Sequence, residues 1–238
     1  MGGRGGSSHI ASGGGGLQNA AYNGVQQVAR RMGISLDIAS FVRYSINPMY
    51  ISQTLQSVQV IYNNFPAMVG RVRYIDANET SSNAYASAGG DGGLHLGLYG
   101  RWSEEQLQRQ WASDVRGGFH PQGAKASSIF VHEMGHQIEA YLNRRDYGNA
   151  WDWGKSSSSI VEAAAKKVDS SITGLSDPKL YRLASEISGY AVSKKNRKEY
   201  PWAVWETLAE AVQDVGDNGA AAKPLSTAIW NELKRRTR

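Results

Sequence analysis

Residues 132–136 read His-Glu-Met-Gly-His, which is the pattern H-E-x-x-H. Two histidines four residues apart lie on the same face of a helix, one turn from each other, so both imidazoles can reach one metal ion. Glu133 is rotated by about a quarter turn from His132, which places its carboxylate over the open side of that ion. The pattern therefore predicts a Zn²⁺ site with His132 and His136 as ligands and Glu133 as the general base.

A zinc ion that activates water has three protein ligands and one open position. The chain contains no cysteine, so the third ligand must be a histidine or a carboxylate. A metzincin would carry a glycine and a histidine at the third and sixth positions after His136, but these positions hold Glu139 and Leu142. The remaining candidates are His120, Glu162, Asp177, Glu186, Glu206, Glu210 and Asp214.

The helix predicted over residues 201–215 is the most informative of the candidate elements. Glu206, Glu210 and Asp214 are spaced four apart, and this acidic row adjoins a broad apolar stripe on the same helix. One carboxylate of such a row can bind a metal while the next accepts a hydrogen bond from a ligating imidazole. We therefore assign Glu206 as the third ligand and Glu210 as the residue behind it, although spacing alone leaves the other candidates open.

Three segments together resemble a known family, the lethal-factor-like gluzincin metallopeptidases, which also occur among prophage-encoded proteins. These segments are His132 to His136, Tyr190, and Glu206-Thr207-Leu208-Ala209-Glu210-Ala211. The resemblance implies that Glu206 is the third zinc ligand and that Tyr190 points at the catalytic water and the substrate carbonyl. It also suggests that substrate lies along an edge strand at Leu94 to Tyr99, with Leu94, His95, Leu96 and Gly97 as the binding residues.

The separation between Tyr190 and Glu206 is wider than in the family pattern, and a basic segment containing Lys194, Lys195, Arg197 and Lys198 fills it. Tyr181 and Tyr200 therefore remain alternatives to Tyr190 as the donor to the oxyanion. His120 is interpreted as a loop histidine, and the alternative is that it lines the cleft.

The elements around these motifs indicate an α+β, zincin-like fold. Residues 69–75, 84–87 and 94–99 are rich in strand-forming patterns, and the last of them alternates strictly between apolar and other positions. We expect a small antiparallel sheet, with its edge strand beside the H-E-x-x-H helix and the glutamate-bearing helix. Within the 238 residues, the predicted parts are a flexible Gly/Ser-rich tail at 1–16, an accessory helical segment at 17–47, and the zincin-like domain at 48–238.

Composition and hydropathy bear on two classes of partner, membranes and nucleic acids. No apolar run approaches the roughly 18 residues that cross a bilayer, and the start of the chain lacks the apolar core of a secretion signal. We therefore expect a cytoplasmic or virion-associated location and no membrane partner. The net charge of +5 is a modest cationic excess, so nucleic acid is an unfavoured partner.

The function expected from these observations is hydrolysis of peptide bonds by zinc-activated water, with a peptide or protein as the substrate. The main alternative is a phage structural or host-interaction protein that retains the zincin fold without relevant proteolysis. A basic, nucleic-acid-associated protein is the third interpretation.

Overall fold

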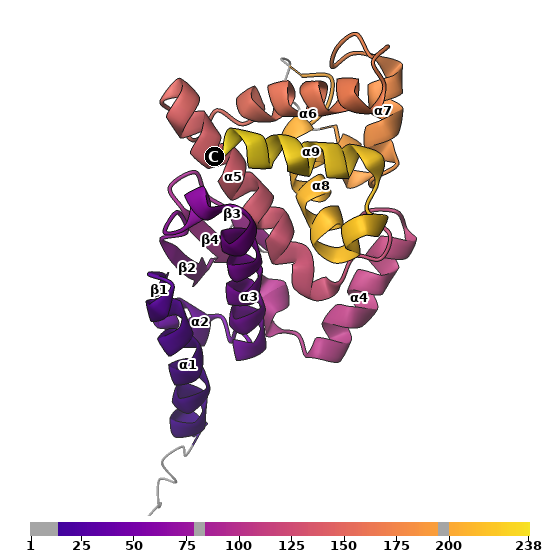
Figure 1. Cartoon of the computed structure of the whole chain (residues 1–238). Coiled ribbons are helices and arrows are strands. Elements are labelled where there is room, and N and C mark those ends of the chain that lie inside the picture. Colours follow the sequence, from indigo (N-terminus) through magenta and orange to yellow (C-terminus); the bar gives the residue numbers. More distant parts are fainter. Residues whose placement is uncertain (1–13, 79–83, 195–199) are drawn as a thin grey trace, which may run out of the picture.

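The computed structural model describes residues 14–78, 84–194 and 200–238 (Figure 1). The helices are α1 (Gly14–Arg31), α2 (Ile38–Arg43), α3 (Pro48–Asn64), α4 (Glu104–Arg116), α5 (Ile129–Tyr147), α6 (Lys155–Val168), α7 (Pro178–Ser185), α8 (Val204–Asn218) and α9 (Pro224–Arg236). The strands are β1 (Ser35–Leu36), β2 (Tyr74–Ala77), β3 (Ala86–Ala88) and β4 (Gly93–Leu96).

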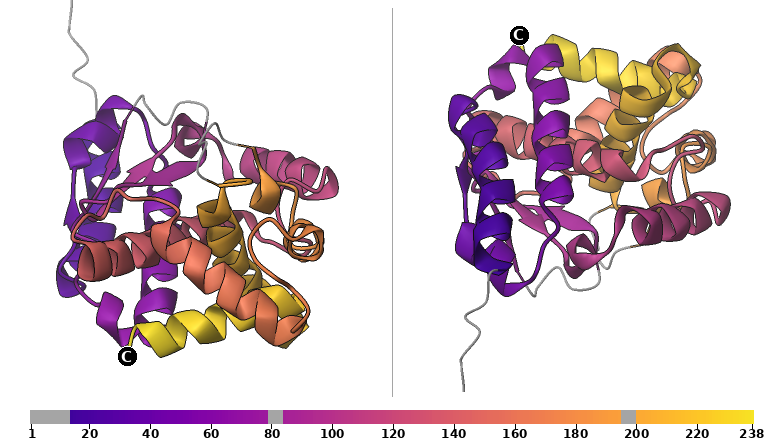
Figure 2. Two further views of the ribbon diagram at one scale, coloured as in Figure 1. Left: turned by 90° about the horizontal axis from the view of Figure 1, so that it is seen from above. Right: turned by 90° about the horizontal axis from the view of Figure 1, so that it is seen from below.

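Helix α5, which contains the H-E-x-x-H pattern, runs through the middle of the molecule. It packs against α3 and β3 on one side and against α6 and α8 on the other (Figures 1 and 2). Most of its residues are buried, as expected for a helix that contacts neighbours on nearly every face. The helix ends at Gly148, whose φ of 79° is the left-handed conformation that glycine adopts readily.

The sheet is mixed, so the prediction of an antiparallel sheet was wrong. Its strand order is β1-β2-β4-β3, in which β1 pairs with β2 and β2 pairs with β4 in parallel. Only β3 and β4 are antiparallel, with Ala88 opposite Leu94 and Ala86 opposite Leu96. Local alternation predicts a strand and its buried face, but it carries no information on which strands become neighbours.

Strand β4 is consequently an interior strand, so the prediction that residues 94–99 form the edge strand was also wrong. It is shorter than predicted, because a 3₁₀ helix begins at Leu98. The outer strand on this side of the sheet is β3. The glycine-rich turn at residues 89–92 joins β3 to β4.

Residues 17–47, predicted as an accessory segment, contribute to the same sheet as the rest of the chain. Within this segment Ser35 and Leu36 pair with Tyr74 and Ile75 of β2. The hydroxyl of Tyr22 on α1 donates a hydrogen bond of 2.7 Å to the carbonyl of Ile46. The predicted tail at 1–16 falls mostly outside the described residues, and α1 begins at Gly14.

Helix ends follow sequence signals where those signals are strong. Ser103 and Gln106 form the reciprocal capping box at the start of α4. Asp177 caps α7 immediately before Pro178, and Asn47 caps α3 in the same way before Pro48. Helix α8 covers residues 204–218 rather than the predicted 201–215.

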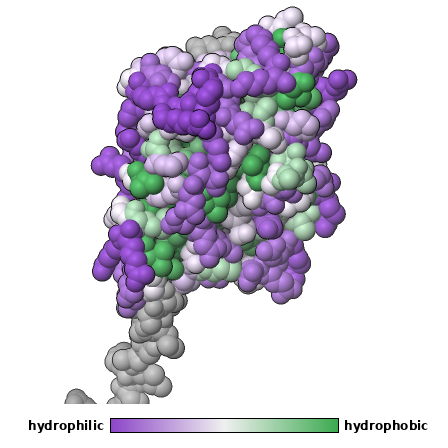
Figure 3. Space-filling model, viewed as in Figure 1, coloured by the Kyte–Doolittle hydropathy of each residue, from purple (hydrophilic) through white to green (hydrophobic). Residues whose placement is uncertain are grey.

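On the face shown in Figure 3, hydrophobic residues are scattered among hydrophilic ones. Among the described residues, no helix combines the length and the apolar character that a membrane span requires.

Candidate metal centre

The close approach of α5 to α8 brings the two halves of the centre together. A Cβ placed on Gly135 would lie 2.7 Å from the Cα of Ala209 and 3.2 Å from its Cβ, so only glycine fits at this point of α5. Ala209 is itself a small residue. The two helices therefore pack almost backbone to backbone within the metal-binding pattern, which carries Glu206 and Glu210 of α8 up to the histidines of α5.

His132, His136 and Glu206 form a buried group that could hold a metal ion. Nε2 of His132 lies 3.3 Å from Oε2 of Glu206, and Nε2 of His136 lies 3.2 Å from the same oxygen. The three ligand atoms all lie within 4.8 Å of one another. The side chains of His132 and Glu206 are each 3% exposed, and that of His136 is 12% exposed, so this donor set is almost removed from water.

The two distances from imidazole nitrogen to the Glu206 oxygen are close to those expected around a tetrahedral zinc ion. With Zn–N and Zn–O bonds of about 2.0–2.2 Å, two ligand atoms of a tetrahedron are about 3.3–3.5 Å apart. A charge-assisted hydrogen bond between imidazole and carboxylate would be shorter, at about 2.7–2.9 Å. Two imidazoles and one carboxylate are also donors of the kind that bind Zn²⁺ in proteins.

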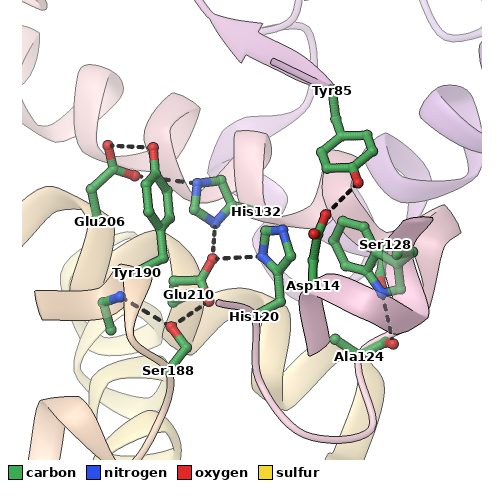
Figure 4. A network of polar contacts seen from close by, with 12 residues as sticks. Tyr85, Asp114, His120, Ala124, Ser128, His132, Ser188, Tyr190, Glu206 and Glu210 are labelled. Atoms are coloured by element: carbon green, nitrogen blue, oxygen red, sulfur yellow. Dashed lines mark hydrogen bonds and ion pairs between the residues drawn. The ribbon is translucent and has the colours of Figure 1, made fainter. Parts of the chain in front are cut away.

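Glu210 lies next to His132 and connects it to two further residues (Figure 4). Its Oε1 is 2.9 Å from Nδ1 of His132 and 3.4 Å from Nδ1 of His120. Its Oε2 accepts a hydrogen bond of 2.7 Å from the hydroxyl of Ser188. A carboxylate on Nδ1 fixes the orientation of a ligating imidazole and directs Nε2 to the metal.

The buried carboxylates favour positive charge at His132. Burial alone would lower the pKa of His132, but its contacts with Glu206 and Glu210 outweigh burial and raise the pKa to about 10. Burial likewise raises the pKa of Glu206, while His136 and His132 hold that pKa well below its ordinary value. A bound cation would supply the same positive charge, in place of the proton on His132.

A cavity of about 240 Å³, here called the metal cavity, opens over the three ligands. It is lined by Ala84, Ala86, Ser87, Ala88, His132, Glu133, His136, Trp153, Tyr190, Trp205 and Glu206. Glu133 is therefore at the wall of the same cavity as the ligands, with 6% of its surface exposed. Gln137, one helical turn further along α5, donates to the carbonyls of Gly89 and Gly93 and so holds the β3–β4 hairpin against α5.

Tyr190 is the tyrosine closest to the ligands among the three that the sequence left open. Its hydroxyl donates to Oε1 of Glu206 at 3.4 Å, and its ring centroid lies 5.8 Å from that of His132. Tyr181 packs edge-on against Trp202, and Tyr200 packs against Trp205. Neither Tyr181 nor Tyr200 lines the metal cavity.

The predicted substrate-binding residues of β4 do not line this cavity. Leu94 and Leu96 are core residues, and His95 contacts Asp76 through its Nδ1 at 2.6 Å. The backbone N–H of Gly97 donates to the carbonyl of Tyr85. Three residues of β3 line the cavity instead, because β3 and not β4 is the outer strand on the side of α5.

The other candidate ligands have separate roles in the structure. Glu162 forms an ion pair with Lys166 along α6, and Asp177 caps α7. Asp214 accepts hydrogen bonds from the Asn218 side chain and from the backbone N–H of Lys223. Glu186 is an exposed residue at the end of α7.

Sequence reasoning missed two contributions to the site. His120 comes from the loop before α5, and its ring is 3% exposed and stacked on Trp111 at 4.1 Å. Trp205 donates through its indole N–H to Oε1 of Glu206 at 3.2 Å. The position of Trp205 directly before the predicted ligand was a usable signal, whereas nothing in the spacing of His120 connects it to Glu210.

The structure therefore contains an H-E-x-x-H helix and a second helix that supplies a glutamate to the same buried point, as a metal site of this pattern requires. Comparison of the chain with models of protein families, with curated proteins and with solved structures finds no match.

Proposed function

We propose that this chain is a zinc-dependent peptidase. The observation that supports the proposal most directly is the buried His132–His136–Glu206 group, with Glu133 at the wall of the cavity that opens over it. This arrangement combines a three-ligand metal site, an open side and a carboxylate base. Peptide hydrolysis uses all three, whereas a purely structural zinc site has four protein ligands and no open side.

When bound, zinc supplies a Lewis acid for the scissile carbonyl and lowers the pKa of water towards about 7. Glu133 accepts the proton of the attacking water and then donates it to the leaving amine nitrogen. The hydroxyl of Tyr190 donates a hydrogen bond to the oxyanion that develops on the carbonyl oxygen. Its contact with Glu206 supports this role, because it keeps the hydroxyl beside the ligands.

Glu210, His120 and Ser188 position the ligands rather than touch substrate. Glu210 is fully buried and holds Nδ1 of His132, and it is itself held by the other two residues. The N–H of Ala191 donates to the Ser188 hydroxyl, which links this network to the segment that carries Tyr190. The orientation of His132 and the position of Tyr190 are thereby coupled.

We place the substrate main chain along β3. Support for this choice comes from the position of β3 as the outer strand and from the contribution of Ala86, Ser87 and Ala88 to the metal cavity. A peptide that adds a strand to a sheet gains main-chain hydrogen bonds that are independent of its sequence.

The test compares the zinc-loaded parent with Glu133→Gln on a mixed peptide library, with product sequencing as the readout. The parent should cleave and Glu133→Gln should not, because the amide cannot accept the proton. Glu162→Gln is the matched control, since Glu162 lies on α6 and pairs only with Lys166 in the contacts described. Equal cleavage by the parent and Glu133→Gln, or no cleavage by either, would show the proposal to be wrong.

A further inference from the structure

A second cavity, here called the side pocket, adjoins the metal cavity. It has a volume of about 300 Å³ and shares His132, Glu133 and Tyr190 with the metal cavity. Its lining residues are Ala84, Tyr85, Ala86, Tyr99, Gln110, Asp114, Phe119, His120, Ile129, His132, Glu133 and Tyr190. A substrate residue next to the scissile bond would therefore project its side chain into this pocket.

The walls of the side pocket are aromatic. Tyr85 and Tyr99 pack with their ring centroids 4.8 Å apart, and Phe119 and Tyr190 form a second pair at the same separation. Aromatic faces carry a negative quadrupole and attract an ammonium or guanidinium group, more strongly where water is excluded. The same walls also accept the aliphatic stem of a long side chain.

Carboxylates are among the polar groups of the side pocket. One oxygen of Asp114 on α4 accepts a hydrogen bond of 2.5 Å from the Tyr85 hydroxyl (Figure 4). The other oxygen accepts one of 2.9 Å from the Gln110 amide. An ionised carboxylate has about four acceptor positions, so Asp114 retains capacity for a donor from a ligand. Glu133 adds a second carboxylate at the border with the metal cavity.

His120 adds a further acceptor to the wall. Its Nδ1 faces Glu210 at 3.4 Å, whereas its buried Nε2 has no hydrogen-bond partner among the described residues. In Figure 4 this nitrogen lies on the side of the ring turned away from Glu210, towards Tyr85 and Asp114. With the Nδ1 hydrogen given to Glu210, Nε2 presents a lone pair to the pocket.

We propose that the side pocket selects a basic residue, arginine or lysine, beside the scissile bond of the substrate. This inference rests on the peptidase function proposed above. Among the described residues no lysine or arginine lines the pocket, so none of them pairs with Asp114 there. A basic side chain would bring a donor and a positive charge to Asp114, an acidic one would be repelled, and an apolar one would leave Nε2 of His120 without a donor.

The first experiment sequences the products of a mixed peptide library cut by the zinc-loaded parent. Arginine or lysine should be enriched at one of the two positions that flank the cleaved bond. Enrichment of apolar or acidic residues at both positions, or no preference at either, would overturn the inference and leave the peptidase function intact. Absence of any cleavage would overturn the peptidase function and, with it, this inference.

The second experiment uses the best arginine peptide and a copy in which citrulline, its uncharged isostere, replaces the arginine. For the parent, kcat/KM should be at least about tenfold higher with arginine than with citrulline. Asp114→Asn should bring this ratio close to one, because it removes the charge while keeping the shape. Glu105→Gln is the control, since Glu105 lies on the same helix, pairs with Arg109 and is 78% exposed.

An unchanged arginine-to-citrulline ratio in Asp114→Asn would overturn the assignment of Asp114 as the residue that selects the charge. Because the readout is a ratio within one variant, a general loss of stability or zinc does not imitate the expected result. The ratio and the activity of Glu105→Gln should match those of the parent.

Discussion

We expect Gly135→Ala to push α5 away from α8 and to weaken zinc binding. The new methyl group would meet the Cα of Ala209 at 2.7 Å, and that atom belongs to the backbone of α8, so it cannot rotate away. Carbon atoms in contact prefer separations of about 3.5–4.0 Å, so the helices must separate locally by about 1 Å.

That displacement is large compared with the tolerance of a zinc site. Metal–ligand distances are held to within about 0.2 Å, and Glu206 lies on α8 less than one turn before Ala209. We therefore expect zinc affinity to fall by at least roughly tenfold. The stability of the metal-free protein should change less, because overpacking costs about 1–3 kcal/mol while alanine gains about 1 kcal/mol over glycine in a helix.

The assay is competition for zinc against a chromophoric chelator, combined with urea unfolding of the metal-free protein. Gly24→Ala is the matched control, because a Cβ at Gly24 on α1 has nothing within 4 Å. This control should stabilise the protein by up to about 1 kcal/mol and leave zinc affinity unchanged. If Gly135→Ala binds zinc as tightly as the parent, the close contact between Gly135 and Ala209 does not position the ligands.

Glu210→Gln should lower the affinity for zinc by about 10–100-fold in the same competition assay, because it removes the charge that orients His132. A variant that binds zinc as tightly as the parent would contradict this role of Glu210. Tyr190→Phe should lower kcat by tenfold or more with little change in KM, whereas Tyr181→Phe should not, since Tyr181 is 41% exposed and outside both cavities. For Glu232, hydrogen bonds, above all from Arg235, lower the pKa of the carboxyl against the opposing effect of burial. Its stabilising contribution is therefore present above about pH 4.5 and is lost as the pH falls below that value. Urea unfolding should show Glu232→Gln less stable than the parent by about 1–3 kcal/mol at pH 7, and this difference should shrink in acid. A difference that stays constant with pH would show that the ionised carboxylate of Glu232 is not the source of the stabilisation.

The parts of the site that lie on long helices could be predicted from the sequence. The i, i+4 spacing that places His132 and His136 on one helix face is a local property, and so is the spacing of Glu206 and Glu210. The structure places each pair on one helix, α5 and α8, and brings the pairs together. Small residues at the crossing, Gly135 and Ala209, fall within the same two segments, although the sequence alone did not reveal their contact.

The parts that depend on long-range packing could not be predicted in the same way. The alternation over residues 94–98 indicates a strand with one buried face, but this pattern is equally compatible with an interior and an outer position in the sheet. The position of β4 between β2 and β3 moves the cavity wall to Ala86–Ala88. The sequence predicts a strand over residues 84–87, but it does not show that this strand lies at the outer edge of the sheet. His120 reaches Glu210 across 90 positions of the chain. Long-range contacts hold its loop there, among them the stacking of His120 on Trp111 and the hydrogen bond from the N–H of Gly189 to the carbonyl of Gly118.

We propose that His132, His136 and Glu206 together hold one catalytic zinc ion. The most direct test of this proposal is a zinc titration of the metal-free parent and of Glu206→Gln, with bound metal measured per chain. We predict about one tightly bound zinc per parent chain and markedly weaker binding by the variant. A parent that binds no zinc, or a Glu206→Gln variant that binds it as tightly as the parent, would contradict the assignment of this centre.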